Sequence, residues 1–121
     1  MHVADTALLG LIEQAGLAVA TLVEDLARDE FLRSRLTRAE VTRQLATLAD
    51  SAAQMTPTAR TRMPELDWDS WDGLRTRLRL PRGEALDEAL WFACQSLVPA
   101  TLLWLRVYRQ SQPELFRMTL A

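Results

Sequence analysis

The apolar residues of this chain recur at alternating steps of four and three, a spacing that places side chains on one face of an α-helix. The first run predicts a long amphipathic helix over about residues 4–28, with a stripe of Leu8, Ile12, Ala15, Val19, Leu22 and Leu26. A short charged segment, Arg28 to Leu36, follows it. Thr37 and Glu40 then have the spacing of a capping box, which predicts the start of a second helix.

The second helix has the same spacing, through Val41, Leu45, Leu48, Ala52 and Met55. It should end where Thr56 and Pro57 form the cap and first position of a short turn. Pro64 then breaks the chain, and Asp67 can cap a third helix. The apolar face of that helix consists of Trp68, Trp71, Leu74 and Leu78. A glycine inside a helix costs about 1 kcal/mol, so Gly73 predicts close approach by a neighbouring backbone.

The last long helix should begin between Glu84 and Leu86, after Pro81 and Gly83 end the third. Its predicted buried stripe contains Leu90, Cys94, Leu97, Thr101, Trp104 and Tyr108. Pro99 is expected to kink it, and Pro113 begins a short tail with Leu115, Phe116 and Leu120. Four main helices with short connections favour an all-α fold, an antiparallel four-helix bundle in a single domain over residues 1–121.

Composition adds little to this interpretation. The chain has 121 residues, 49 % of them hydrophobic, and a net charge of -2, so any basic site must be local. Cys94 is the single cysteine and lies in an apolar stretch, which predicts a core side chain, no disulfide and a cytoplasmic location. The N-terminus has no basic leader, and acidic residues interrupt the apolar run, so we expect neither a signal peptide nor a membrane span.

The arginines are clustered at one place. Arg75, Arg77, Arg79 and Arg82 fall within eight residues, directly after the acidic residues Glu65, Asp67, Asp69 and Asp72. Such blocks are usually solvated and paired with each other. Four arginines can also hold RNA or another phosphate without a global positive charge. A third interpretation is that they form salt bridges with the acidic residues of a second subunit.

No catalytic set accompanies the cluster. His2, the only histidine, lies at the chain end, and the sequence has neither a Gly-rich phosphate loop nor a Cys/His metal set. We therefore expect no cofactor and no metal. Scattered carboxylates such as Glu24, Asp25 and Asp50 could bind a metal only if the fold brought them together.

Several short segments together resemble the HepT-like (DUF86) toxins of the HEPN superfamily. They are Asp29-Glu-Phe-Leu32, Leu48-Ala-Asp-Ser-Ala52, Met63-Pro-Glu-Leu-Asp-Trp68, Gly73-Leu-Arg75, Leu90-Trp91 and Leu97-Val-Pro99. The resemblance covers about residues 8–109 and leaves 110–121 as a C-terminal tail. Its most specific part is the run from Pro64 to Arg75.

The resemblance implies a HEPN four-helix bundle that forms a homodimer, with a ribonuclease cleft at the dimer interface. It also implies a paired MntA-like nucleotidyltransferase antitoxin. In the family motif, Arg is followed by Asn, then by His after four intervening residues, and then by Tyr two positions later. The Arg and His serve RNA cleavage, and the antitoxin adenylylates the Tyr.

This chain keeps only the first residue of that motif. Arg75 matches the Arg, but Thr76 replaces Asn, Leu80 replaces His and Arg82 replaces Tyr, while Asp50 stands at the position of a family Glu. Leucine cannot transfer protons, a contribution worth about 10²- to 10⁴-fold in rate. The leading hypothesis is therefore a catalytically degenerate component that binds RNA or nucleotide, or serves in assembly.

The alternative is a working ribonuclease toxin with a non-standard site, controlled by a nucleotidyltransferase antitoxin. Its activity would rest on Arg75 with Asp50 or another carboxylate, with or without a metal. Membership of a fold does not by itself decide between these functions.

Overall fold

The structure, a computed structural model, describes residues 3–117, and these residues are helical with no strand. This confirms the prediction of an all-α protein. Along the described residues the helices are α1 (Val3–Val23), α2 (Arg28–Arg33), α3 (Arg35–Gln54), α4 (Pro57–Arg62), α5 (Trp68–Arg77), α6 (Glu84–Phe92), the π-helical η1 (Ala93–Leu97), α7 (Val98–Ser111) and the 3₁₀-helical η2 (Pro113–Phe116).

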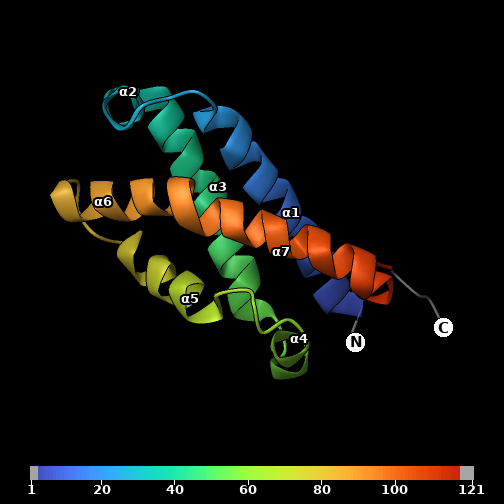
Figure 1. Ribbon diagram of the computed structural model, residues 1–121. Helices are drawn as coiled ribbons and strands as arrows, with labels where there is room; N and C mark the ends of the chain where they lie inside the picture. Colours follow the sequence, from blue (N-terminus) through green and yellow to red (C-terminus); the bar gives the residue numbers. More distant parts are fainter. Residues whose placement is uncertain (1–2, 118–121) are drawn as a thin grey trace.

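Long helices form the body of the molecule. Helices α1 and α3 pack side by side, α7 packs on α1, and α5 packs on α3. Helix α6, η1 and α7 together form one long C-terminal rod that passes over the others (Figure 1). Helix α5 also touches α6, so it lies between α3 and the first half of this rod.

The predicted apolar stripes form the core. Leu45, Leu48, Leu90 and Leu105 are completely buried. Leu9 and Val23 occupy the core of α1 in place of Leu8 and Leu22, which are only partly buried against it. In α7, Leu105 takes the deepest position and Trp104 is partly buried.

The first helix is shorter than predicted. Helix α1 ends at Val23, and Asp25 adopts a positive φ of 62°, in the left-handed region that terminates helices. The charged segment that follows, predicted as a connection, contains the short helix α2. The Glu30 carboxylate accepts a hydrogen bond from the Ala27 N–H (2.9 Å), which stabilises its first turn.

The predicted capping box at Thr37 is wrong. Helix α3 begins at Arg35, so Thr37 already lies in its first turn, where its hydroxyl accepts a hydrogen bond from Ser34 (2.9 Å). The Glu40 side chain instead pairs with Arg43 (2.5 Å) and Gln44 (2.9 Å) on the next turn. Local partners along the helix surface therefore compete successfully with the cap.

The other two predicted caps are confirmed. The Thr56 hydroxyl accepts a hydrogen bond from the Ala59 N–H (3.2 Å) at the start of α4. The Asp67 carboxylate accepts one from the Ser70 N–H (3.1 Å) at the start of α5. Buried Asp5 also binds Thr56 through its N–H (3.0 Å) and hydroxyl (2.8 Å), and so fixes α1 to this turn.

The prediction that a neighbouring backbone approaches Gly73 closely is wrong for the single chain. A Cβ atom built on Gly73 would meet nothing within 4 Å. The close approach lies at Gly16 on α1, where a Cβ atom would come within 3.0 Å of the Leu102 side chain on α7.

Pro99 coincides with an interruption of the last helix. The backbone widens into the π-helical turn η1 directly before it, and the rod changes direction there (Figure 1). A π turn accommodates the proline because the hydrogen-bond register shifts where its N–H is missing. Beyond α7 the tail folds back, since Leu115 is buried and its carbonyl accepts a hydrogen bond from Thr6 (3.2 Å). Leu120 and His2 lie outside the described residues.

Two helical stretches are long and apolar enough to cross a membrane, Val3–Val23 and Glu84–Ser111. Each also contributes buried residues to the core, and core helices of soluble proteins pass the same test. The cytoplasmic location stays a prediction.

Candidate functional site

The motif arginine and the matching carboxylate come together in the fold. Arg75, near the end of α5, donates from its Nε to Oδ1 of Asp50 on α3, at 2.8 Å. Both side chains are about half exposed (47 % and 56 %). An ion pair in this much water contributes about 0–1 kcal/mol, so it orients the guanidinium more than it stabilises the fold.

The remaining motif positions face elsewhere. Leu80 is 40 % exposed in the turn after α5, and Thr76 lies on the exposed side of that helix. Arg82 lines a groove beside Arg38, near the start of α3. Asp50 lies twelve residues beyond Arg38 on the same helix, about 18 Å at 1.5 Å per residue.

The predicted arginine cluster is therefore divided among different surroundings. Arg75 is paired with Asp50, Arg77 lines a groove between α5 and α6, and Arg82 lines the groove near the start of α3. Arg79 is exposed in the turn. RNA binding by these four residues stays a prediction, and they do not line one common pocket among the described residues.

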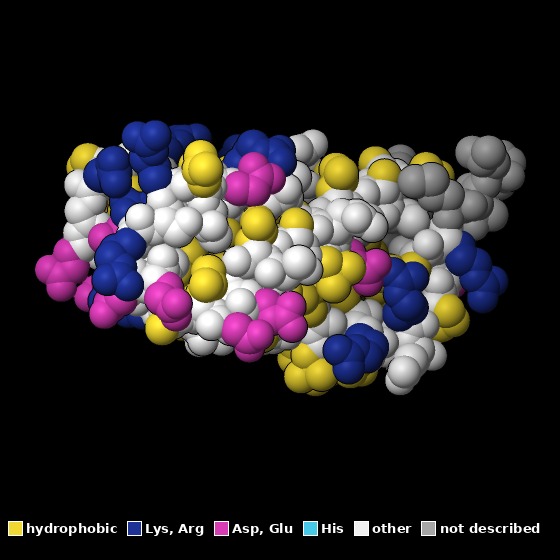
Figure 2. All heavy atoms as spheres, turned by 90° about the horizontal axis from the view of Figure 1, so that it is seen from above, with side chains coloured by type: hydrophobic (Ala, Val, Ile, Leu, Met, Phe, Trp, Pro, Cys, Tyr) yellow, Lys and Arg dark blue, Asp and Glu magenta, His cyan; other side chains and the backbone are white. Residues whose placement is uncertain are grey.

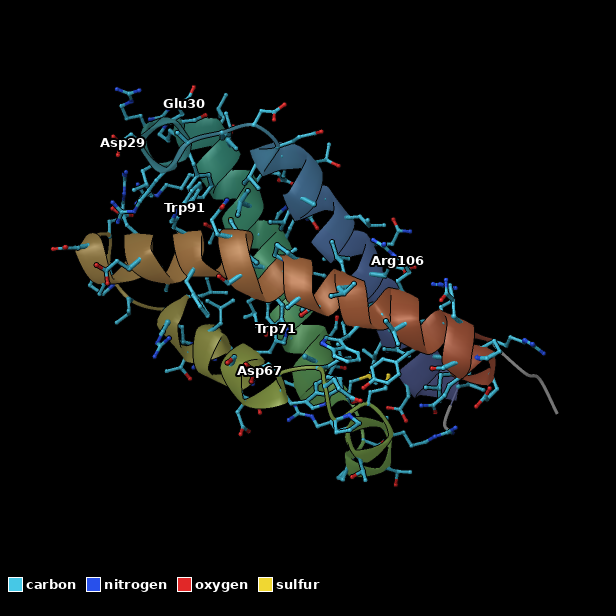
Figure 3. The ribbon with its side chains drawn as sticks, viewed as in Figure 1. Asp29, Glu30, Asp67, Trp71, Trp91 and Arg106 are labelled. Carbon is cyan, nitrogen blue, oxygen red and sulfur yellow. The ribbon has the colours of Figure 1, made fainter. Side chains whose placement is uncertain are left out.

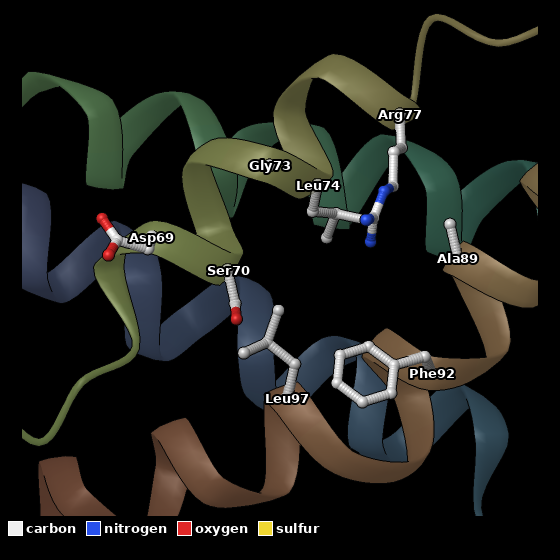
Figure 4. A pocket seen from close by; sticks show the side chains of 8 residues that line it. All are labelled: Asp69, Ser70, Gly73, Leu74, Arg77, Ala89, Phe92 and Leu97. Carbon is white, nitrogen blue, oxygen red and sulfur yellow. The ribbon is translucent and has the colours of Figure 1, made fainter.

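The most distinctive hollow lies between α5 and the rod of α6 and η1. Three adjoining depressions share Phe92 and form one groove, called here the Phe92 groove. Its central part, of about 230 Å³, is lined by Asp69, Ser70, Gly73, Leu74, Arg77, Ala89, Phe92 and Leu97. In Figure 4, Phe92 and Leu97 point from the rod towards α5, and Arg77 reaches back from the end of α5.

Apolar side chains continue from this groove along the rod. Phe92, Leu103 and Val107 are 51 %, 52 % and 39 % exposed, and with Ala100 they share one helical face. No charged residue occupies positions 92, 96, 100, 103 or 107. An unpaired stripe of this kind is typical of a surface that another molecule covers.

The two walls of the groove are fixed to each other from inside. Trp71 of α5 is 1 % exposed, points into the core (Figure 3) and donates from its indole N–H to the Thr101 hydroxyl on α7, at 3.0 Å. Trp68 donates to the Met63 carbonyl at 2.9 Å. Both tryptophans therefore belong to the core, as predicted, and give α5 a defined position against the rod.

The carboxylates around the groove are partly engaged. Asp69 lies at the start of α5 and Arg77 at its end, and both line the groove. Asp72 points away and pairs with Arg60 at 2.9 and 3.0 Å, and this guanidinium lowers the pKa of the Asp72 carboxyl. At the far end of the groove, Glu65 accepts a short hydrogen bond from the Tyr108 hydroxyl.

The described residues offer little catalytic chemistry here. Burial raises the pKa of the Cys94 thiol to about 12, so it stays protonated and behaves as a core side chain. Burial, together with the hydrogen bond to Glu65, raises the pKa of Tyr108 to about 12. Within residues 3–117, no three His, Cys, Asp or Glu side chains gather as a set that could hold a metal.

Sequence reasoning missed residues that line the Phe92 groove and the groove near the start of α3. Phe92 was passed over because it lies off the buried stripe of its helix, yet a large aromatic on the polar side of an amphipathic helix is itself a sign of an interface. Arg35 belongs to the segment predicted as a charged connection, and Arg38 lies inside the predicted capping box. Both residues lie beside Arg82 in the fold, because the start of α6 and the connection before it pack near the first turn of α3.

Comparison with known proteins gave no match, whether by family model, by curated sequence or by solved structure.

Proposed function

We propose that this chain is a catalytically degenerate HepT-like protein that works as an assembly component, and that it dimerises through the Phe92 groove. The family assignment rests on the sequence resemblance. The observation that supports assembly most strongly is Phe92, which is 51 % exposed and lines the groove together with Leu74 and Leu97. Burying a Phe side chain is worth about 1.5–3 kcal/mol, so a partner that covers it gains affinity.

The second copy is the occupant favoured by symmetry. Asp69 and Arg77 lie four residues before and after Gly73, and all three line the groove. A two-fold axis near Gly73 would therefore place Asp69 of each copy opposite Arg77 of the other. Such an interface is self-complementary in charge as well as in apolar surface.

Gly73 has a reason to be glycine in this arrangement. Its Cα faces open space within the chain, although a glycine in the middle of α5 costs about 1 kcal/mol relative to alanine. A crossing helix α5 from the second copy would supply the close approach that the sequence predicts and that the single chain lacks. This is the third interpretation of the charge pattern, in which acidic residues and arginines pair between subunits.

RNA holding is less well supported by the geometry. The Phe92 groove borders Glu65, Asp67, Asp69 and Glu88 as well as Arg77, so its carboxylates repel phosphates. Arg75, the motif residue, is already paired with Asp50.

A charge swap tests the proposal. Asp69→Arg alone or Arg77→Glu alone should weaken dimerisation about tenfold or more, because each places like charges opposite one another. The double variant Asp69→Arg/Arg77→Glu should recover most of the wild-type affinity, as measured by sedimentation equilibrium. Asp29→Arg, on exposed α2, serves as a control that should change nothing. Equal behaviour of the single and double variants would contradict the two-fold arrangement.

The ribonuclease alternative makes a different prediction. With Leu80 in place of the family His, the wild-type protein should cleave RNA no faster than a buffer blank, with or without Mg²⁺ or Mn²⁺. The variant Leu80→His/Arg82→Tyr restores the motif's acid-base group and should gain activity if the family assignment holds. Wild-type cleavage that disappears in Arg75→Ala would instead establish the alternative.

A further inference from the structure

A second groove lies between the start of α3 and α6. The ion pair of Arg75 with Asp50 lies towards the other end of α3. The groove has a volume of about 380 Å³ and is lined by Arg35, Arg38, Ala39, Thr42, Arg82, Leu86 and Leu90. The arginines come from two separate segments, the first turn of α3 and the connection between α5 and α6. Both helix starts lie at the end of the molecule away from the chain termini (Figure 1).

The groove combines an apolar floor with a positive rim. Ala39, Leu86 and Leu90 supply the floor, and Leu86 and Leu90 belong to the same buried cluster as the core. The arginine stems cover its sides, since long side chains can lay their methylenes along apolar surface and keep the charged head in water. In Figure 2, both arginines and acidic side chains lie at this end of the molecule, on the left of the view, with the arginines mainly along its upper edge.

Two of the three arginines have no carboxylate partner among residues 3–117. Arg38 pairs with Asp87 at 3.1 Å and is only 14 % exposed, whereas Arg35 and Arg82 are exposed and form no ion pair with the described residues. The first turn of α3 also contains no acidic residue. Positive side chains at a helix N-terminus are electrostatically unfavourable, so this turn gathers positive charge at a cost to the isolated chain.

A large apolar side chain stands beside these arginines. Leu36 follows Arg35 in the same turn of α3 and is 81 % exposed, more than any other large hydrophobic residue among those described. Neither a free phosphate nor an inorganic anion would cover it. Arginine next to an exposed aliphatic side chain and an apolar floor is the composition of a protein-binding surface.

We propose that this groove, with Arg35, Arg38 and Arg82 along its rim and Leu36 exposed on the neighbouring face of the same helical turn, docks an acidic segment of a different protein. The segment places one or two apolar side chains on Leu86 and Leu90 and sets carboxylates against Arg35 and Arg82. Arg38 is already paired with Asp87 at 3.1 Å, so Arg35 and Arg82 are the arginines left for the carboxylates of the segment. The site is separate from the Phe92 groove, and none of its lining residues is shared with it.

Selection from a displayed library of random 12-residue peptides on the immobilised full chain tests this inference. The enriched peptides should combine Asp or Glu with Leu, Ile or Phe. Synthetic copies should bind Arg35→Glu and Arg82→Glu at least tenfold more weakly than wild type in fluorescence anisotropy. Leu36→Ser should also weaken binding. Arg106→Glu, the same charge change on the exposed side of α7, should leave it within twofold. All variants should keep the wild-type circular dichroism spectrum, and Arg35→Glu should melt no lower than wild type, because a carboxylate suits the start of α3 better than an arginine.

Three results would overturn the inference. One is a selection that yields no binders, and another is a set of peptides without acidic enrichment or indifferent to Arg35→Glu and Arg82→Glu. The third is competition for the groove by inorganic phosphate or 5′-AMP at concentrations below that of the peptide, which would make it a phosphate site. Peptides that lose affinity only in Phe92→Asp would report on the other groove and would also count against this one.

Discussion

At the scale of single residues, the buried polar contacts decide how precisely the walls of the Phe92 groove are held. The hydrogen bond from Trp71 to Thr101 joins α5 to α7 through the core, where both side chains are almost fully buried. A buried donor that loses its acceptor costs about 1–3 kcal/mol because it gives up water without compensation. This bond is therefore worth more to the position of α5 than any exposed ion pair around it.

Thr101→Val should lower the free energy of unfolding by about 1–3 kcal/mol, since valine matches the shape of threonine but leaves the Trp71 indole N–H unpaired. Urea denaturation followed by Trp fluorescence measures the change. Thr101→Ser is the matched control, because it keeps the hydroxyl and loses only a methyl group, at about 1 kcal/mol. A valine variant as stable as wild type would show that the hydrogen bond contributes nothing.

At the scale of elements, Arg60 holds three helices together. From α4 it pairs with Asp72 on α5 (2.9 Å), donates to the Ala52 carbonyl on α3 (2.8 Å), and lies over the Trp68 ring at 5.0 Å. The ion pair is partly exposed, at 24 % and 45 %, so its electrostatic part is screened by water. The hydrogen bond from Arg60 to the Ala52 carbonyl and the stacking of Arg60 on Trp68 do not depend on the charge of Asp72.

This arrangement has a defined pH dependence. Arg60 lowers the pKa of Asp72, so the stability from this pair is present above the unfolded pKa, near 3.9, and is lost as pH falls through the lower folded value. Arg60→Met should destabilise the protein by about 1–2 kcal/mol at pH 7. The difference in free energy of unfolding from wild type should narrow between pH 4 and pH 2, in urea titrations at each pH. Arg106→Met, at an exposed arginine with no ion pair to the described residues, is the surface control. If the difference in free energy of unfolding stays constant over this range, the hydrogen bond to the Ala52 carbonyl and the stacking on Trp68 account for the whole effect of Arg60.

Helical periodicity predicted the element types well because burial dominates them. The stripe Val41, Leu45, Leu48 and Ala52 is fully buried, and the caps at Thr56 and Asp67 form as predicted. Boundaries failed where local side-chain pairing competes with capping, as at Glu40. The short helix α2 was missed because six residues are too few to show a period.

Sequence reasoning was weaker for the candidate sites, because a groove is made by residues far apart in the chain. The pairing of Arg75 with Asp50 joins residues 25 positions apart, and the groove with Arg35, Arg38 and Arg82 joins the first turn of α3 to the connection between α5 and α6. The run of arginines from Arg75 to Arg82 looked like one site because its members are adjacent in sequence. In the structure, Arg75 and Arg77 lie two positions apart on α5 and therefore point in different directions. Arg79 and Arg82 lie in the connection that follows the helix.

At the scale of the whole molecule, two surfaces with different chemistry lie on the α6–α7 rod and its neighbours. The Phe92 groove combines exposed apolar side chains with Asp69 and Arg77 at the two ends of α5, which suits a second copy. The groove near the start of α3 is apolar with a positive rim, which suits an acidic partner. Under the proposed function, the chain uses both surfaces at once as an assembly component.

The most direct measurement of the central proposal is the molar mass in solution of the wild-type protein and of Phe92→Asp, by light scattering across a concentration series. The proposal predicts a dimer of the 13.7 kDa chain for wild type and a monomer with unchanged helical circular dichroism for Phe92→Asp. Leu11→Asp, which also places a carboxylate at a half-exposed leucine but on α1, should remain a dimer. A wild-type monomer at every concentration, or a dimer that Phe92→Asp leaves intact, would contradict assembly through the Phe92 groove.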